Sequence, residues 1–183
     1  MRPLAPLDPS ALSLAQRRVH DEIVAGPRGA VTGPFGAWLR NPAIADHAQK
    51  LGIVMRFELG VPARITELVT LLAARHYNCP YEWSLHAPIA RRAGLAEATI
   101  QAIRQGVRPV MMALDEASAY DVALALYRTG DIDDDAYRRA MASFGERGTV
   151  ELVAAVGYAA MVSFTLNVFR VPPVGDDVLD GPG

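Results

Sequence analysis

Apolar residues recur along most of the chain at intervals of three and four positions, which is the spacing of one face of an α-helix. No segment alternates cleanly between apolar and polar residues in the way that half-buried strands do. The pattern therefore predicts an all-α protein of about seven to eight helices with connections of roughly 2–10 residues. The expected helices span residues 11–25, 42–58, 63–77, 80–93, 96–105, 115–128, 133–143 and 149–169.

Capping and turn residues set the expected helix limits. Ser13 and Asp115 stand where a side-chain oxygen can cap a first turn, and Pro42 suits a first helical position. The Gly- and Pro-rich segment 26–42 is expected to be an ordered loop. Pro88 falls inside the predicted 80–93 helix and should kink or split it, because proline lacks an N–H group.

The 63–77 segment is apolar around most of its circumference, which predicts a central helix surrounded by the others. Glu67 lies in the middle of this segment. A buried carboxylate without a partner costs several kcal/mol or more. Glu67 therefore needs a histidine or arginine on the next helix, or one of Arg56, Arg64 and Arg75.

Composition and charge are those of an ordinary globular protein. Hydrophobic residues make up 51% of the chain and charged residues 21%, and the formal net charge is −2. No basic surface is indicated, so nucleic acid is not expected as a partner. The longest apolar run, 152–162, predicts a buried helix and not a membrane span, and residues 1–18 lack the apolar core of a secretory signal. We expect a cytoplasmic protein with no membrane partner.

Cys79 is the one cysteine in the chain. A single thiol cannot form an internal disulfide, and no second soft ligand is present for a zinc cluster. The sequence shows no metal or nucleotide signature, so no cofactor is expected.

The segment 75–88, RHYNCPYEWSLHAP, holds the candidate chemistry. If Pro80 opens a helix, Glu82 and His86 lie one turn apart on the same face, and Cys79 is expected to point the same way. A carboxylate beside an imidazole raises the imidazole pKa and suits proton transfer near neutral pH. A thiol at a helix N-terminus suits nucleophilic or redox work. The ordinary alternatives are a solvated Glu–His contact and a buried, inert cysteine.

At these residues the chain resembles the carboxymuconolactone decarboxylase family, whose fold is shared with the alkylhydroperoxidase D proteins. The thiol peroxidase branch carries a Glu, a Cys-x-x-Cys pair and a His, which Glu67, Cys79 and His86 match in part. The decarboxylase-type branch carries a Glu followed four residues later by a His, which Glu82 and His86 resemble. Segments 14–21, 33–35, 64–68 and 144–147 resemble a longer subgroup of uncharacterised members.

The resemblance implies an alkylhydroperoxidase D-like helical bundle formed by a single domain, with a family core over about 42–106, a helical extension over about 115–170 and a loose tail over 171–183. It also implies a homo-oligomer, a trimer or a hexamer. Surplus apolar surface on the helices 150–169 and 117–127 supports self-association.

One departure from the peroxidase pattern changes the expected reaction. Glu82 stands where the second cysteine belongs, so the disulfide that a two-cysteine peroxidase closes cannot form within the chain. The main hypothesis is decarboxylation or isomerisation of a small lactone or carboxylic acid. His86 would be the proton donor, Glu82 or Glu67 would orient it, and Arg56 or Arg75 would hold the substrate carboxylate.

Three alternatives stay open on the sequence alone. The first is a single-cysteine peroxidase or redox enzyme that works through Cys79. The second is a non-catalytic protein that binds a small molecule on the same scaffold. The third is a metal site at Glu82 and His86, for which only two good ligands are visible.

Overall fold

The computed structural model describes residues 4–179, and every regular element in that range is helical, which confirms the all-α prediction. Two short elements, η1 and η2, are a 3₁₀ turn and a π-helical turn. The elements are η1 (Pro9–Ala11), α1 (Leu14–Ala25), α2 (Phe35–Trp38), α3 (Pro42–Ile53), η2 (Val54–Glu58), α4 (Ala63–His76), α5 (Pro80–Arg92), α6 (Glu97–Arg104), α7 (Leu114–Thr129) and α8 (Asp134–Val168).

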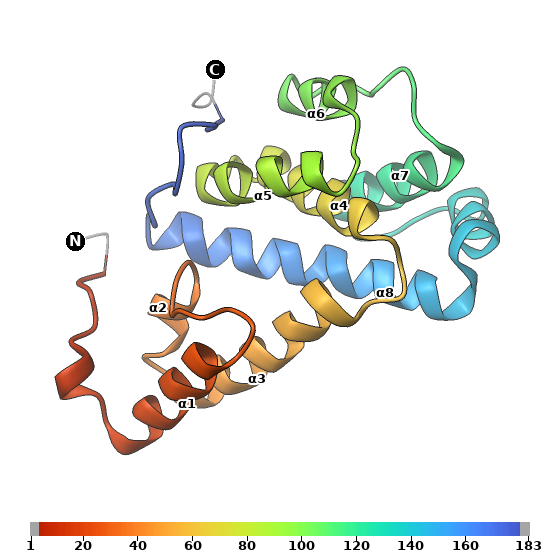
Figure 1. Cartoon of the computed structure of the whole chain (residues 1–183). Helices are drawn as coiled ribbons and strands as arrows, with labels where there is room; N and C mark the ends of the chain where they lie inside the picture. Colours follow the sequence, from red (N-terminus) through yellow and green to blue (C-terminus); the bar gives the residue numbers. More distant parts are fainter. Residues whose placement is uncertain (1–3, 180–183) are drawn as a thin grey trace.

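The helices form two layers, and α4 lies at the centre of the larger one, as its apolar circumference predicts. It packs against α5, α6, α7 and α8 (Figure 1). Ile65, Leu68 and Leu71 are fully buried there. A side chain on α4 is therefore held in a close-packed core, where its position changes little.

Helices α1, α2 and α3 form a second layer on the other side of α8 (Figure 1). Val19, Ile23 and Leu39 pack there against Leu166 of α8 in a separate apolar cluster. The indole N–H of Trp38 donates to the hydroxyl oxygen of Thr165 at 3.0 Å, which ties α2 to α8. Helix α8 thus contributes to both cores and fixes the distance between the two layers.

The helix limits follow the capping residues with one exception. Ser13 caps α1 by accepting from the N–H of Gln16, and Gly130 ends α7 in a left-handed conformation. Asp115 does not cap α7, because that helix begins at Leu114, one residue earlier than predicted. Of the two expected effects of Pro88, a kink or a split, the split does not occur, since α5 continues to Arg92.

The predicted helices 133–143 and 149–169 are joined end to end as α8. The join is marked by Gly145, which has φ 66° and ψ −177° and where the chain bends (Figure 1). A positive φ of this size favours glycine. By length and composition alone α8 could cross a membrane. Its packing against α4 and α7 accounts for one face of the helix, which includes Leu152, Val156 and Ala159, as core residues.

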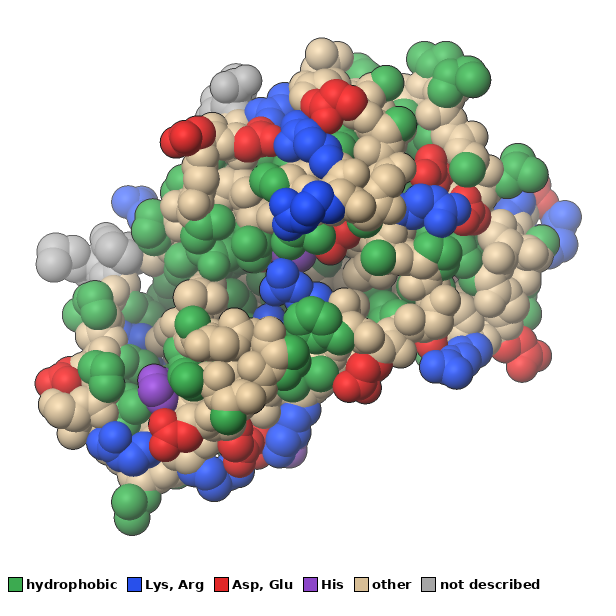
Figure 2. Space-filling model, in the orientation of Figure 1, with side chains coloured by type: hydrophobic (Ala, Val, Ile, Leu, Met, Phe, Trp, Pro, Cys, Tyr) green, Lys and Arg blue, Asp and Glu red, His purple; other side chains and the backbone are tan. Residues whose placement is uncertain are grey.

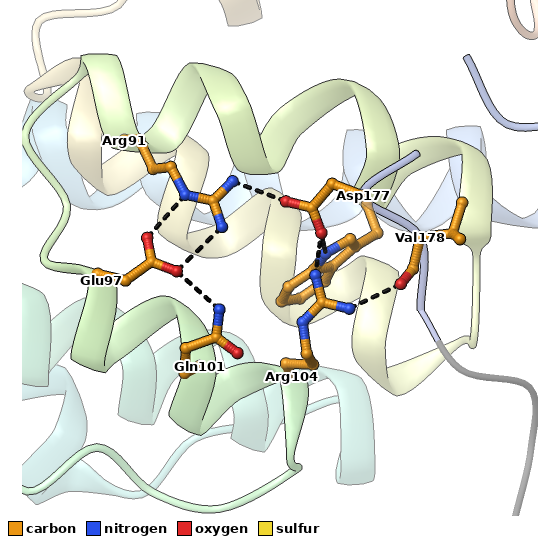
Figure 3. A network of polar contacts seen from close by, with 7 residues as sticks. Arg91, Glu97, Gln101, Arg104, Asp177 and Val178 are labelled. Carbon is orange, nitrogen blue, oxygen red and sulfur yellow. Dashed lines mark hydrogen bonds and ion pairs between the residues drawn. The ribbon is translucent and has the colours of Figure 1, made fainter. Parts of the chain in front are cut away.

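The tail was expected to be loose, but residues 177–179 make specific contacts with the helices. The indole N–H of Trp83 donates to Asp177 at 3.2 Å, and the guanidinium groups of Arg91 and Arg104 bind the same carboxylate (Figure 3). Leu179 is buried in the main core. The tail is therefore docked on α5 and α6; residues 180–183 lie outside the described range.

Candidate active site

A cavity of about 90 Å³ lies between the two layers of helices. Its walls come from the loop between α1 and α2, from α3 and η2, and from α4, α5 and α8. Figure 2 shows this face hollowed between the α3 layer and the α5 layer, with basic side chains at the opening. The polar and aromatic residues that line it include Arg28, Arg56, Glu67, Tyr81, Glu82, His86 and Tyr158.

The cavity brings together the two residues that sequence reasoning paired across helices. Nδ1 of His86 on α5 lies 2.8 Å from Oε2 of Glu67 on α4, within hydrogen-bond distance. Both side chains are mostly buried, with 13% and 9% of their surface exposed. Glu67 has therefore found the histidine partner that its apolar surroundings required.

Glu82 completes the group from one turn before His86 on α5. Its Oε2 atom lies 3.7 Å from Nε2 of His86, and the whole residue is only 4% exposed. Burial raises the pKa of the Glu82 carboxyl, and the nearby negative charge of Glu67 raises it further. Burial opposes protonation of His86, but the two carboxylates outweigh it and raise the His86 pKa. The protonation of Glu82 and that of His86 are therefore coupled.

Local sequence explains why these groups meet. Asn78 adopts φ 47° in the tight turn after α4, and asparagine tolerates this left-handed conformation better than most residues. Pro80 then opens α5 at a position where its missing N–H costs nothing. The turn lays α5 against α4, so the Glu82–His86 face of α5 meets Glu67.

Two guanidinium groups reach the cavity from outside α4 and α5. Arg56 stands on η2 at the exposed rim, and Arg28 comes from the loop after α1. Neither forms an ion pair with a carboxylate in the described residues, and Nε of Arg28 is buried without a hydrogen-bond partner there. Burial lowers the pKa of Arg28, although a guanidinium stays charged at neutral pH. The cavity therefore carries positive charge suited to an anion.

Gly52 on α3 leaves room for the side chain of Arg28. A Cβ atom at Gly52 would overlap the hydroxyl of Tyr158 and the guanidinium of Arg28. The Tyr158 hydroxyl donates to the carbonyl of Ala48 at 3.3 Å, and burial raises its pKa to about 12. It is therefore a neutral hydrogen-bonding group next to Arg28.

Cys79 does not line this cavity but lies behind its wall. It is fully buried in the apolar cluster between α8 and the layer of α1, α2 and α3. Its neighbours there include Tyr81, Val162 and Leu166, and it is not one of the cavity-lining residues. It precedes the helix in an extended conformation, φ −105° and ψ 94°, so the helical spacing to Glu82 and His86 does not apply to it. Burial raises its thiol pKa to about 12, which leaves it protonated at neutral pH.

The two arginines proposed for substrate binding are separated by the fold. Arg56 lines the cavity, whereas Arg75 lines a different cleft at the far end of α4. Sequence reasoning missed Arg28, Tyr81 and Tyr158. The one signal near them was the Gly33-Pro34-Phe35 loop noted in the family resemblance, which does line the cavity.

The described residues contain no group of three or more His, Cys, Asp and Glu side chains placed to hold a metal ion. The group of Glu67, Glu82 and His86 is suited instead to moving protons. A buried imidazole between two carboxylates can donate a proton to a bound molecule and recover it from solvent.

Comparison with solved structures identifies the fold class. The chain is similar to an uncharacterised peroxidase-related protein from Ralstonia eutropha JMP134 with an alkylhydroperoxidase AhpD core, at a TM-score of 0.76 and 12% identity over 94% of this chain and 92% of that one. It is also similar to an uncharacterised peroxidase-related protein from Silicibacter sp. TM1040, at 0.72 and 14% over 97% and 96%. A protein of unknown function from Agrobacterium tumefaciens matches at 0.65 and 20% over 79% and 100%. The fold is therefore AhpD-like.

A family model matches part of the same region. Residues 43–123 match the model of the carboxymuconolactone decarboxylase family. The matched range includes α4 and α5, which supply Glu67, Glu82 and His86. No curated protein sequence shows a significant match.

Proposed function

We propose that the chain is an enzyme that decarboxylates or isomerises a small lactone or carboxylic acid, with His86 as the proton donor. The observation that carries this proposal is the 2.8 Å contact between His86 Nδ1 and Glu67 Oε2 at the wall of a cavity. Glu67 holds the imidazole ring and stabilises its protonated form. Nε2, on the other side of the ring, is then the atom that serves the substrate and Glu82.

The proposed step balances without any cofactor. The bond from the substrate carboxylate to its α-carbon breaks, carbon dioxide leaves, and the electron pair is delocalised into the neighbouring carbonyl group. The resulting carbanion or dienolate takes a proton from Nε2 of His86. The neutral imidazole then recovers a proton from solvent, and the Glu82 carboxyl, 3.7 Å from Nε2, can relay it. In an isomerisation the Glu82 carboxylate would remove a proton from one carbon of the substrate and His86 would return a proton at another, so that no carbon dioxide leaves and the protons balance.

Arg56 and Arg28 support an anionic substrate. Both guanidinium groups line the cavity, and neither is neutralised by an ion pair within the described residues. A guanidinium binds a carboxylate through two parallel hydrogen bonds, which fixes its orientation as well as its position. We assign Arg56 to substrate entry at the rim and Arg28 to the inner wall.

The direct test is turnover of carboxymuconolactone and related lactones by the purified protein, followed as release of carbon dioxide. His86→Ala should abolish release, and His20→Ala, on the outer layer, should not. Failure to turn over any lactone or small carboxylic acid would remove the proposal. Binding of such a compound in the cavity without turnover would instead support the alternative of a non-catalytic binding protein.

The alternative of a peroxidase acting through Cys79 lacks comparable support. The thiol is fully buried, outside the cavity, and has a raised pKa. A peroxidatic cysteine needs access and a lowered pKa. The peroxidase-related names belong to structural neighbours of 12% and 14% identity, which share the fold.

Self-association stays a prediction. Helix α8 exposes Val150, Val153 and Phe164, whereas the α7 segment 117–127 is largely used within the chain. The exposed face of α8 is therefore the better candidate for contact with a second copy. Light scattering on the purified protein, with Phe164→Asp as the interface variant, tests for the expected trimer or hexamer.

A further inference from the structure

A second cleft lies at the far end of α4, away from the candidate active site. It has a volume of about 180 Å³ and is formed by the last turns of α4 and α6 and by the middle of α7. Its floor is apolar and aromatic, with Leu72, Ile103 and Tyr120 buried beneath it. None of the lining residues is acidic.

The rim of this cleft carries positive charge without a counter-charge. Arg75 and Arg128 both line it, and neither pairs with a carboxylate in the described residues. Arg108, next to the same region, differs in binding Asp121. Isolated guanidinium groups on one apolar cleft are the arrangement that recognises a carboxylate or a phosphate.

Arg75 is held in place although it has no protein partner. Its Nε atom is buried and makes no hydrogen bond within residues 4–179. The turn at Gly106, with φ 71°, lies against its guanidinium, and a Cβ there would be 3.5 Å from Nη2. The carbonyls at the end of α4 accept from the N–H groups of residues 77–79, so they do not use the Arg75 side chain. A buried donor in this state calls for an acceptor that comes from outside.

We propose that this cleft binds a small organic anion, a carboxylate with a single ring or an apolar body of that size. The carboxylate would lie between Arg75 and Arg128, and the ring would pack over Leu72 and Tyr120. The size follows from the volume, because a cavity of about 150 Å³ in another protein accommodates benzene. The site is distinct from the cavity at His86 and does not depend on the proposed reaction.

His76 completes the rim as a neutral group. Its ring stacks on Tyr127, with centroids 5.8 Å apart. Burial and the nearby Arg128 charge lower its pKa, so at neutral pH the positive charge of the cleft comes from the two arginines. Binding should therefore persist at pH 7 to 8 and weaken with salt, because the rim is open to solvent.

The test uses benzoate as the probe and benzamide as its neutral counterpart, with amide chemical shifts of the full chain as the readout. Benzoate should shift the amides of Gly106 and Leu124 in a saturable way. Arg75→Gln and Arg128→Gln should each weaken this binding about tenfold, as expected for loss of one charge-assisted hydrogen bond. Arg128 is exposed, so its variant should fold normally.

Two control variants separate this site from its alternatives. Arg92→Gln removes an exposed arginine outside both cavities and should leave binding unchanged. Arg56→Gln should also leave the Gly106 and Leu124 shifts intact, because it alters only the other cavity. The proposal is overturned if Arg92→Gln weakens binding as much as Arg75→Gln, if benzamide binds equally well, or if no saturable shift occurs at Gly106.

Discussion

Glu67 and His86 are nineteen positions apart in the sequence, yet Oε2 of one lies 2.8 Å from Nδ1 of the other. The contact joins the centre of the most buried helix to the helix that follows it. A carboxylate in such a core is stable only with a partner, so this pair both stabilises the fold and sets the protonation of the imidazole. Structure and chemistry therefore depend on the same hydrogen bond.

Glu67→Gln should lower the pKa of His86. The amide can still accept the hydrogen bond, but without the negative charge the effect of burial on the imidazolium is less opposed. The raised pKa of His86 stabilises the fold below its unfolded value of about 6.5, and this stabilisation is lost as pH rises through the folded value. The variant should therefore lose stability at pH 6 and little at pH 9.

A histidine proton titration by NMR and urea unfolding at both pH values measure these effects. Asp21→Asn is the matched control, because Asp21 lies 2.9 Å from His20 on the surface and should not affect His86. An unchanged His86 titration in Glu67→Gln would show that the pair does not set its protonation.

Gly52→Ala should impair the candidate active site while leaving the fold intact. The new methyl group displaces the flexible end of Arg28 and forces the rigid ring of Tyr158 to turn away, a cost that the helix preference for alanine over glycine, about 1 kcal/mol, partly offsets. We expect unfolding free energy within about 1 kcal/mol of the wild type and a roughly tenfold loss of affinity for a carboxylate ligand. Gly157→Ala on α8, where a Cβ meets nothing, is the control. Equal loss in both variants would contradict the role of Gly52.

Cys79 should behave as a buried core residue. With a thiol pKa of about 12 and no exposure, it should resist thiol reagents at pH 8 until the chain unfolds. Cys79→Ala should cost on the order of 1 kcal/mol of stability and retain any turnover that depends on His86. Rapid modification of the native protein, or loss of turnover in Cys79→Ala at full stability, would restore the peroxidase hypothesis.

Periodicity and burial costs were enough to predict much of this arrangement. The helices follow from apolar spacing, and the cost of an unpaired carboxylate in an apolar helix predicts that Glu67 needs a histidine or arginine partner, which in the structure is His86. Both inferences use local chemistry that any packing of α4 against α5 must satisfy. They did not require knowledge of the complete topology.

The remaining site residues depend on tertiary placement that local patterns do not contain. Arg28 reaches the cavity from a loop. Arg75 lies in the last turn of α4 and lines the second cleft, away from Glu67. Cys79 was expected to point the same way as His86. It precedes the helix in an extended conformation, so helical spacing does not apply to it. The tail looked loose because Pro, Gly and acidic residues give it no helical pattern, whereas its docking depends on distant arginines.

Asp177→Asn should release the tail from α5 and α6. The carboxylate accepts hydrogen bonds from Trp83 and from the guanidinium groups of Arg91 and Arg104 (Figure 3). Burial opposes its charge, but these donors hold its pKa below the ordinary value. The interaction therefore stabilises the fold above the unfolded pKa of about 3.9 and is lost as pH falls through the folded value.

We expect Asp177→Asn to lower the unfolding free energy by about 1–3 kcal/mol at pH 7, as for a charged acceptor of several hydrogen bonds. The difference from wild type should shrink as the pH is lowered from 5 towards 2, followed by urea unfolding. Asp176→Asn is the matched control, because the side chain of Asp176 is exposed and forms no ion pair in the described residues. If both variants unfold at the same urea concentration as the wild type, the docked tail contributes nothing to stability, and Trp83 and Arg104 hold α5 and α6 together without it.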